Sequence, residues 1–319
     1  IVMVVGIAAY ATTGGADFGI GFWDLTAGGR EKGFALRSRL ERSIGLVWEA
    51  NHVWLIFVLV VCWTCFSVAY SSIVSTLWIA FLLAAIGIIF RGAAFAFRGE
   101  ITQPRAQQVF GGLFAVSSIL TPFVLGAMLG GVASGRVPVG NAAGDPWSSW
   151  ANPTGVYFGV IAVVAGIYLA AIYTAADAQS AGEKDLEDAL WRRAIGAGVA
   201  GGLFAAAGLG ILYADARPLF DDMFSKPAPL IFVALTVVAG LFTLWAILQR
   251  RLGLARITSA TTVVAGIFAW AAAQWSYRLP GALTIDEAAA STAMLASVVI
   301  AAGIATRNVP STRRAWTVL

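Results

Sequence analysis

Apolar stretches long enough to cross a membrane divide the sequence along its whole length, and short bursts of charged residues separate them. A helix needs about 20 consecutive apolar residues to span the hydrocarbon core of a bilayer. Hydrophobic residues make up 59% of the 319 positions and charged residues 12%, whereas soluble domains carry about 25% charged residues. The sequence therefore predicts an integral membrane protein, with little material left for a soluble domain.

Nine apolar segments account for most of the chain, which predicts an all-α protein with nine transmembrane helices. The segments cover residues 1–23, 46–69, 72–97, 107–133, 154–177, 191–213, 228–249, 257–277 and 288–306. The first segment is longer than the apolar region of a signal peptide and has no basic leader, so we expect it to be a retained membrane helix.

Lysine and arginine residues are unequally divided between the two ends of these segments. Of the 21 in the chain, 16 lie in or beside the odd-numbered connections and the C-terminal tail, four lie in the even-numbered connections, and Arg91 lies within a segment. Cytoplasmic connections of membrane proteins are enriched in these residues. We therefore expect the N-terminus outside and the C-terminus in the cytoplasm. We assign the net charge of +4 to topology rather than to nucleic-acid binding.

A polar cluster stands at the start of the second apolar segment, where residues 48–54 read WEANHVW. Lipid does not solvate a carboxylate, an amide or an imidazole, so such groups in a membrane helix indicate a proton, ion or substrate pathway lined by protein. His52 lies three residues after Glu49 and therefore on the same helical face. A partly buried carboxylate can have its pKa raised towards neutrality. We therefore expect Glu49 to be the main proton-conducting group.

The other ionisable residues within the first three segments lie at the same predicted membrane side. Asp17 is near the inner end of the first segment, and Arg91 and Arg98 are near the inner end of the third. Two acids and two bases from adjacent helices could form a buried ion-pair network, because burial without pairing is costly. Simpler roles remain open: Arg98 could extend to the interface, and Asp17 could bond a neighbouring helix.

Ligands for a metal or haem are scarce in this sequence. His52 is the only histidine, and Cys62 and Cys65 lie in an apolar segment without a second pair of cysteines. We expect the two cysteines to pack as small buried side chains. Without partner ligands, the chain cannot assemble a zinc site or a bis-histidine haem site by itself.

Four sequence blocks together resemble subunit II of the cytochrome bd family of quinol oxidases, including its cyanide-insensitive branch. They are GADFGIG at 15–21, WEANHVWL at 48–55, FRGAAFAFR at 90–98 and LTID at 283–286. The resemblance implies a subunit of a respiratory complex in the bacterial cytoplasmic membrane. Such a complex oxidises quinol and reduces dioxygen to water, with protons drawn from the cytoplasm.

The resemblance also implies the fold and the partners. The fold would be a single membrane domain with two four-helix bundles, residues 1–133 and 154–277, and a peripheral helix at 288–306. The chain would bind no haem or metal and would pack against subunit I, which holds two b-type haems and one d-type haem. Quinone, membrane lipids and a small accessory single-helix subunit are further expected partners, and nucleic acid is not.

The family's proton route assigns roles to individual residues. The acid that follows the tryptophan of the second block lies on that route, and in this sequence it is Glu49. Asp17 matches the acid of the first block, and His52 would assist. Supporting positions would be Trp48, Asn51, Trp54, Arg91 and Arg98. The chain departs from many members, which carry an aspartate where it has Gly14 and Asp-Gly where it has Glu49-Ala50.

Two other interpretations use the same buried charges. In the first, the ion pairs only lock the helices and dock subunit I, and protons travel inside that partner. In the second, the chain is an independent proton-coupled transporter, for which the sequence shows no obvious inverted repeat or pair of broken helices.

Overall fold

The computed structural model describes residues 1–28, 33–44, 47–98, 103–275 and 277–308. The helices are α1 (Val2–Leu25), α2 (Phe34–Ile44), α3 (Val47–Cys65), α4 (Ser67–Thr76), α5 (Trp78–Arg98), α6 (Pro104–Ala133), α7 (Pro153–Ser180), α8 (Lys184–Asp215), α9 (Arg217–Ser225), α10 (Pro227–Leu248), α11 (Leu252–Ala273), α12 (Ile285–Ala288) and α13 (Thr292–Asn308). Strands β1 (Tyr277–Leu279) and β2 (Leu283–Thr284) form an antiparallel hairpin.

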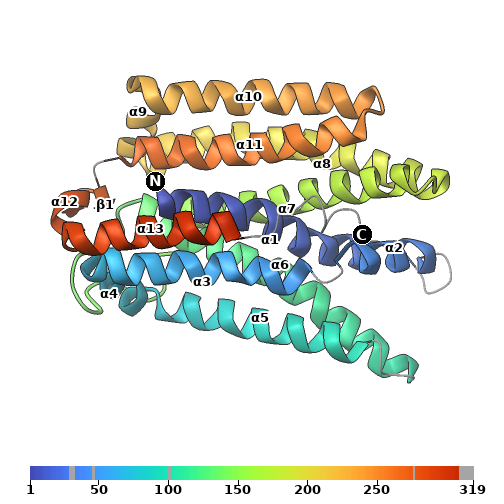
Figure 1. The fold of residues 1–319 in the computed structure, drawn as a ribbon, viewed down its shortest axis with the longest axis horizontal. Helices are drawn as coiled ribbons and strands as arrows, with labels where there is room; N and C mark the ends of the chain where they lie inside the picture. Colours follow the sequence, from blue (N-terminus) through green and yellow to red (C-terminus); the bar gives the residue numbers. More distant parts are fainter. Residues whose placement is uncertain (29–32, 45–46, 99–102, 276, 309–319) are drawn as a thin grey trace.

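The long helices lie side by side along one axis of the molecule (Figure 1). Helices α4, α9 and α12 and strand β1 gather at one end, and α2 lies at the other. Among the described helices, α5, α6, α7, α8, α10 and α11 are long and apolar enough to cross a membrane. Large apolar side chains such as Leu203, Val238 and Leu241 are more than 60% exposed, as lipid-facing positions require. The prediction of a mostly helical, multi-pass membrane protein is confirmed.

The second and third predicted segments have different boundaries in the structure. Helix α3 ends at Cys65, Phe66 leaves the helical conformation (φ −142°, ψ 55°), and the separate helix α4 precedes α5. Hydrogen bonds from distant backbone hold this break, because the N–H of Ala290 donates to the carbonyl of Cys65 at 2.8 Å. The N–H of Gly140 likewise donates to Ser72 Oγ at 3.0 Å. The segment 66–77 therefore belongs to the end of the molecule at which α4, α9 and α12 gather.

Helices α1 and α7 touch backbone to backbone at three glycines. A Cβ atom at Gly19 would overlap the carbonyl group of Gly166, and a Cβ at Gly166 would lie 2.5 Å from the carbonyl oxygen of Gly15. Small residues allow membrane helices to approach this closely. Beyond the crossing, Trp23 Nε1 donates to the carbonyl of Ile167 at 2.9 Å. This contact places the second half of α1, which carries Asp17, in the middle of the bundle.

Helix α2 connects the end of α1 to the end of α7. Arg37 lies 3.5 Å from Asp24 of α1. Arg39 and Arg42 lie 3.7 and 3.3 Å from Glu183, which follows α7. Arg37, Arg39 and Arg42 are therefore paired with acids from two different parts of the chain.

At the opposite end, Asp215 joins three elements. Its carboxylate accepts two hydrogen bonds from the Arg136 guanidinium, at 2.7 and 2.9 Å. It also accepts from the backbone N–H and the hydroxyl of Thr154, at 3.0 and 2.6 Å. Bidentate, charge-assisted hydrogen bonds of this kind are the strong ones in proteins. The last residue of α8 therefore fixes the first turn of α7 and the connection that follows α6.

We expect Asp215→Ala to lower the stability of the protein by about 1–2 kcal/mol, because both partners lose their charge-assisted bonds. Thermal unfolding of the detergent-solubilised protein measures the change. Asp221→Ala is the matched control: its carboxylate pairs with Arg217 on one helix, and both side chains are more than half exposed. Exposed pairs contribute little, so the control should unfold as the wild type does. Equal midpoints for all three proteins would contradict the role given to Asp215.

Candidate functional site

A buried ion pair between Asp17 of α1 and Arg91 of α5 is the centre of the site. Arg91 Nη2 donates to Asp17 Oδ1 at 2.8 Å and to the backbone carbonyl of Asp17 at 3.1 Å. The side chain of Arg91 is only 3% exposed, and that of Asp17 is 5% exposed. Arg91 Nε donates to Ser118 Oγ of α6 at 3.1 Å. The guanidinium group therefore binds two other helices, which compensates the cost of removing its charge from water.

Two aromatic rings complete the environment of Arg91. Its guanidinium carbon lies 4.8 Å from the ring centroid of Phe18 and 5.0 Å from that of Phe114. A guanidinium group is planar and weakly hydrated, so it can stack on aromatic faces and bind a carboxylate at the same time. A lysine could not make this set of contacts. Arg91 is therefore a fixed positive charge at a defined place in the bundle.

The polar cluster of α3 lies next to this ion pair. The His52 ring is 6.2 Å from the rings of both Tyr10 and Phe18, in edge-on geometry. Phe18 is the same residue that stacks against Arg91. Asn51 Nδ2 donates to the backbone carbonyl of Thr13 at 3.4 Å. The structure thus places His52, Asn51 and the Asp17–Arg91 pair around the same part of α1.

Other predicted residues are not part of this described neighbourhood. Trp48 and Glu49 begin α3, and Arg98 ends α5, but their side chains lie outside the described ones. Trp54 is half-buried and packs edge-on against Phe57 of its own helix, with the ring centroids 6.1 Å apart.

Several site residues were missed in the sequence. Ser118 and Phe114 lie on α6, which carried no predicted site residue, and Tyr10 and Thr13 lie in an apolar part of α1. A serine pair at 117–118 in an apolar helix was a usable signal, since it interrupts the apolar pattern. Nothing in the spacing of Phe114 or Tyr10 distinguishes them from ordinary packing residues.

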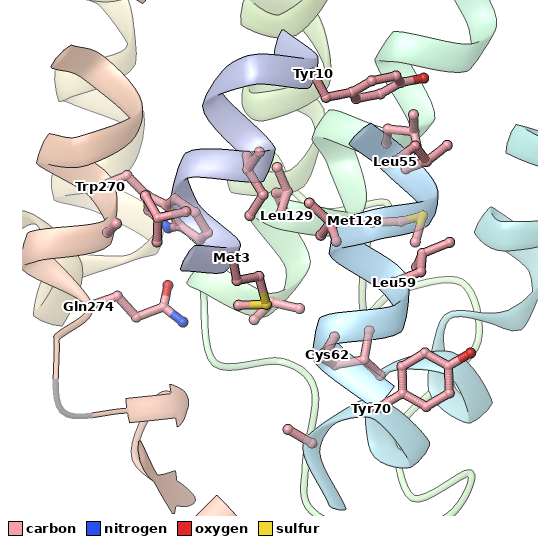
Figure 2. Close-up of a pocket in the computed structure, with 18 of the residues that line it drawn as sticks. Met3, Tyr10, Leu55, Leu59, Cys62, Tyr70, Met128, Leu129, Trp270 and Gln274 are labelled. Atoms are coloured by element: carbon pink, nitrogen blue, oxygen red, sulfur yellow. The ribbon is translucent and has the colours of Figure 1, made fainter. Parts of the chain in front are cut away.

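An apolar groove of about 220 Å³ runs from Tyr10 towards the end of the molecule that carries α4. Residues of α1, α3, α4, α6 and α11 line it. Figure 2 shows Tyr10 at one end, with its ring extending from α1 towards Leu55 of α3, and Tyr70 and Gln274 at the other. The polar site and the apolar groove therefore meet at Tyr10.

Comparison with known proteins identifies the family. Residues 1–313 match the sequence profile of the family described as cytochrome bd terminal oxidase subunit II. The chain belongs to this subunit II family. The resemblance found in the four sequence blocks is thereby confirmed.

Two bd oxidase proteins illustrate the similarity. Over 114 residues the chain is 32% identical to cytochrome bd ubiquinol oxidase subunit 2 of Bacillus subtilis (strain 168). The matched region covers 36% of this chain and 33% of the Bacillus protein. The match thus spans about a third of the Bacillus protein's length. A chain in the structure of bd oxidase from Geobacillus thermodenitrificans has the same fold, with a TM-score of 0.78 and 21% identity over 94% of this chain and 91% of that chain.

Potential metal ligands are few and scattered in the described part of this subunit II. No group of three or more His, Cys, Asp or Glu side chains among them could hold a metal ion. The ring of His52 is packed edge-on by Tyr10 and Phe18, with the ring centroids 6.2 Å away in both cases. Cys65 is buried in α3, and Cys62 of the same helix faces the apolar groove.

Proposed function

We propose that the chain is the haem-free subunit II of a cytochrome bd-type quinol:dioxygen oxidoreductase in the bacterial cytoplasmic membrane. Its partner would be the haem-bearing subunit I, where quinol oxidation and dioxygen reduction take place. Membership of the subunit II family over residues 1–313 supports this assignment. We also propose nine transmembrane helices with the N-terminus outside, since the distribution of lysine and arginine supports that orientation.

Within this complex we propose a cytoplasmic proton-uptake route through the site around α1 and α3. Glu49 would receive protons, and Asp17 and His52 would assist their passage towards subunit I. The observation that carries the proposal is the buried Asp17–Arg91 pair beside His52, since ionisable groups inside a membrane protein usually serve transport of ions or protons. Arg91 holds Asp17 in place and fixes the local charge.

We expect Glu49→Gln to lower oxidase turnover at least about tenfold, because an amide of the same size cannot exchange a proton. Haem content should remain near that of the wild type, since no haem ligand changes. Quinol-driven oxygen consumption and the absorption spectrum of the purified complex measure the two quantities. Glu41→Gln is the matched control, because the Glu41 side chain is exposed on α2.

The structural interpretation of the same charges predicts a different pattern. If subunit II only docks subunit I, Glu49→Ala would lower assembly and haem retention together, and the assembled fraction would keep full turnover. Wild-type turnover in Glu49→Gln, with normal assembly, would contradict the proposed proton route.

A further inference from the structure

Tyr10 occupies space on α1 that the absence of a side chain at Gly14 creates. A Cβ atom at Gly14 would lie 2.8 and 2.9 Å from two carbon atoms of the Tyr10 ring and 3.4 Å from the carbon that bears the hydroxyl. Contacts this short do not occur with real Cβ atoms, so any other residue at position 14 would displace the ring. The ring thus lies close against its own helix because position 14 is glycine.

The hydroxyl group of Tyr10 is buried, and it has no hydrogen-bond partner within the described part of the chain. The same holds for Asp17 Oδ2. Buried polar atoms in proteins nearly always have a partner, so an exception needs an explanation. Both atoms lie in the proposed proton site: the Tyr10 ring is 6.4 Å from the ring of Phe18, which stacks on Arg91, and 6.2 Å from the ring of His52.

Tyr10 and Asp17 lie at different positions along α1 and therefore at different depths in the membrane. The Cα of Tyr10 precedes that of Asp17 by seven residues, which is about 10 Å along a helix. With the proposed orientation, Tyr10 is the deeper of the two from the cytoplasm. Its hydroxyl stands where the polar site ends and the apolar groove begins (Figure 2). Beyond Tyr10, the described walls of the groove are mostly apolar.

We propose that the Tyr10 hydroxyl is a proton-relay group, one step deeper in the membrane than Asp17 and His52. This inference rests on the proton-uptake route proposed above. A hydroxyl can accept one proton while it donates another. A proton arriving from Asp17 or His52 bonds to the hydroxyl oxygen as the original O–H proton leaves to a water molecule on the far side. The phenol is neutral before and after, and no electron is transferred.

The decisive variant is Tyr10→Phe in the intact oxidase complex, which removes only the hydroxyl and keeps the ring beside Gly14. Turnover should fall about fivefold or more, with a larger solvent isotope effect and unchanged haem content. Tyr70→Phe is the matched control, because Tyr70 lines the far end of the same groove and should tolerate the loss of its hydroxyl. Wild-type turnover in Tyr10→Phe would overturn the proposal.

A second experiment tests whether another proton-exchanging group in the space of the Tyr10 ring can replace the Tyr10 hydroxyl. Tyr10→Ala removes both ring and hydroxyl and should lower turnover, while Tyr10→Ala combined with Gly14→Asp puts a carboxyl group into the vacated space. We expect this double variant to recover turnover to within about threefold of the wild type. Tyr10→Ala with Gly14→Asn has the same shape without an exchangeable acid and should stay low. Equal turnover in the two double variants would overturn the relay.

The outcomes also separate this inference from the function on which it rests. Full turnover in Glu49→Gln would overturn the proton route and the Tyr10 relay together. Depressed turnover in Glu49→Gln with full turnover in Tyr10→Phe would overturn the relay alone.

Discussion

Replacing Arg91 with leucine will destabilise the protein by about 3–5 kcal/mol, because it leaves the buried carboxylate of Asp17 without its cation. Asp17 Oδ1 loses the 2.8 Å bond from Nη2, and Ser118 Oγ loses its 3.1 Å bond from Nε. We expect little assembled, haem-containing complex from this variant. The yield of complex from membranes and its thermal unfolding midpoint measure the effect.

The double variant Asp17→Leu/Arg91→Leu separates charge from packing. With both charges removed, no buried ion is left uncompensated, and replacing a buried ion pair by apolar residues is often close to neutral for stability. Assembly should recover, while turnover stays low if Asp17 belongs to the proton route. A double variant as poorly assembled as Arg91→Leu would show that the unpaired charge is not the cause of the loss.

Gly19→Ala will also impair assembly, because the added methyl group meets backbone rather than a movable side chain. Its Cβ would overlap the carbonyl of Gly166 and come within 2.8 Å of the Ala170 Cβ. Overpacking of a tight core costs about 1–3 kcal/mol, and α1 and α7 must separate to relieve it. Since Asp17 lies on the same stretch of α1, turnover per assembled complex should fall as well.

Gly210→Ala is the matched control for this substitution. Gly210 is a helical glycine of α8, and apart from its own helix backbone no atom lies within 4 Å of a Cβ at that position. Alanine is the better helix former, so the control should unfold at or above the wild-type temperature. An equal loss in both variants would contradict the importance of the α1–α7 contact.

Hydrophobic patterning predicted a membrane protein and most of its helices, because apolar runs of about 20 residues typically form membrane-spanning helices. It did not predict the break at Phe66 or the separate helix α4. Those features depend on hydrogen bonds from Gly140 and Ala290, which are far away in the sequence. An apolar run therefore indicates a helix, but bonds formed only in the folded protein decide where it ends.

The candidate site was predictable to the extent that it depends on charge. Asp17 and Arg91 stand out in apolar surroundings, and the cost of burial requires a partner for each. The contribution of Ser118 was not predictable, since it depends on how closely α6 approaches α1 and α5. Tyr10 was missed for a similar reason, because its position depends on an empty space beside Gly14.

The pairing of α2 with the end of α7 has a consequence for the biogenesis of the protein. Glu183 follows Arg42 by 141 residues, and chains are synthesised from the N-terminus. Arg39 and Arg42 therefore leave the ribosome well before Glu183, and their ion pairs with it form only after that later segment has been made. In the proposed orientation the two arginines lie on the cytoplasmic side, and their later pairing with Glu183 joins α2 to the end of α7.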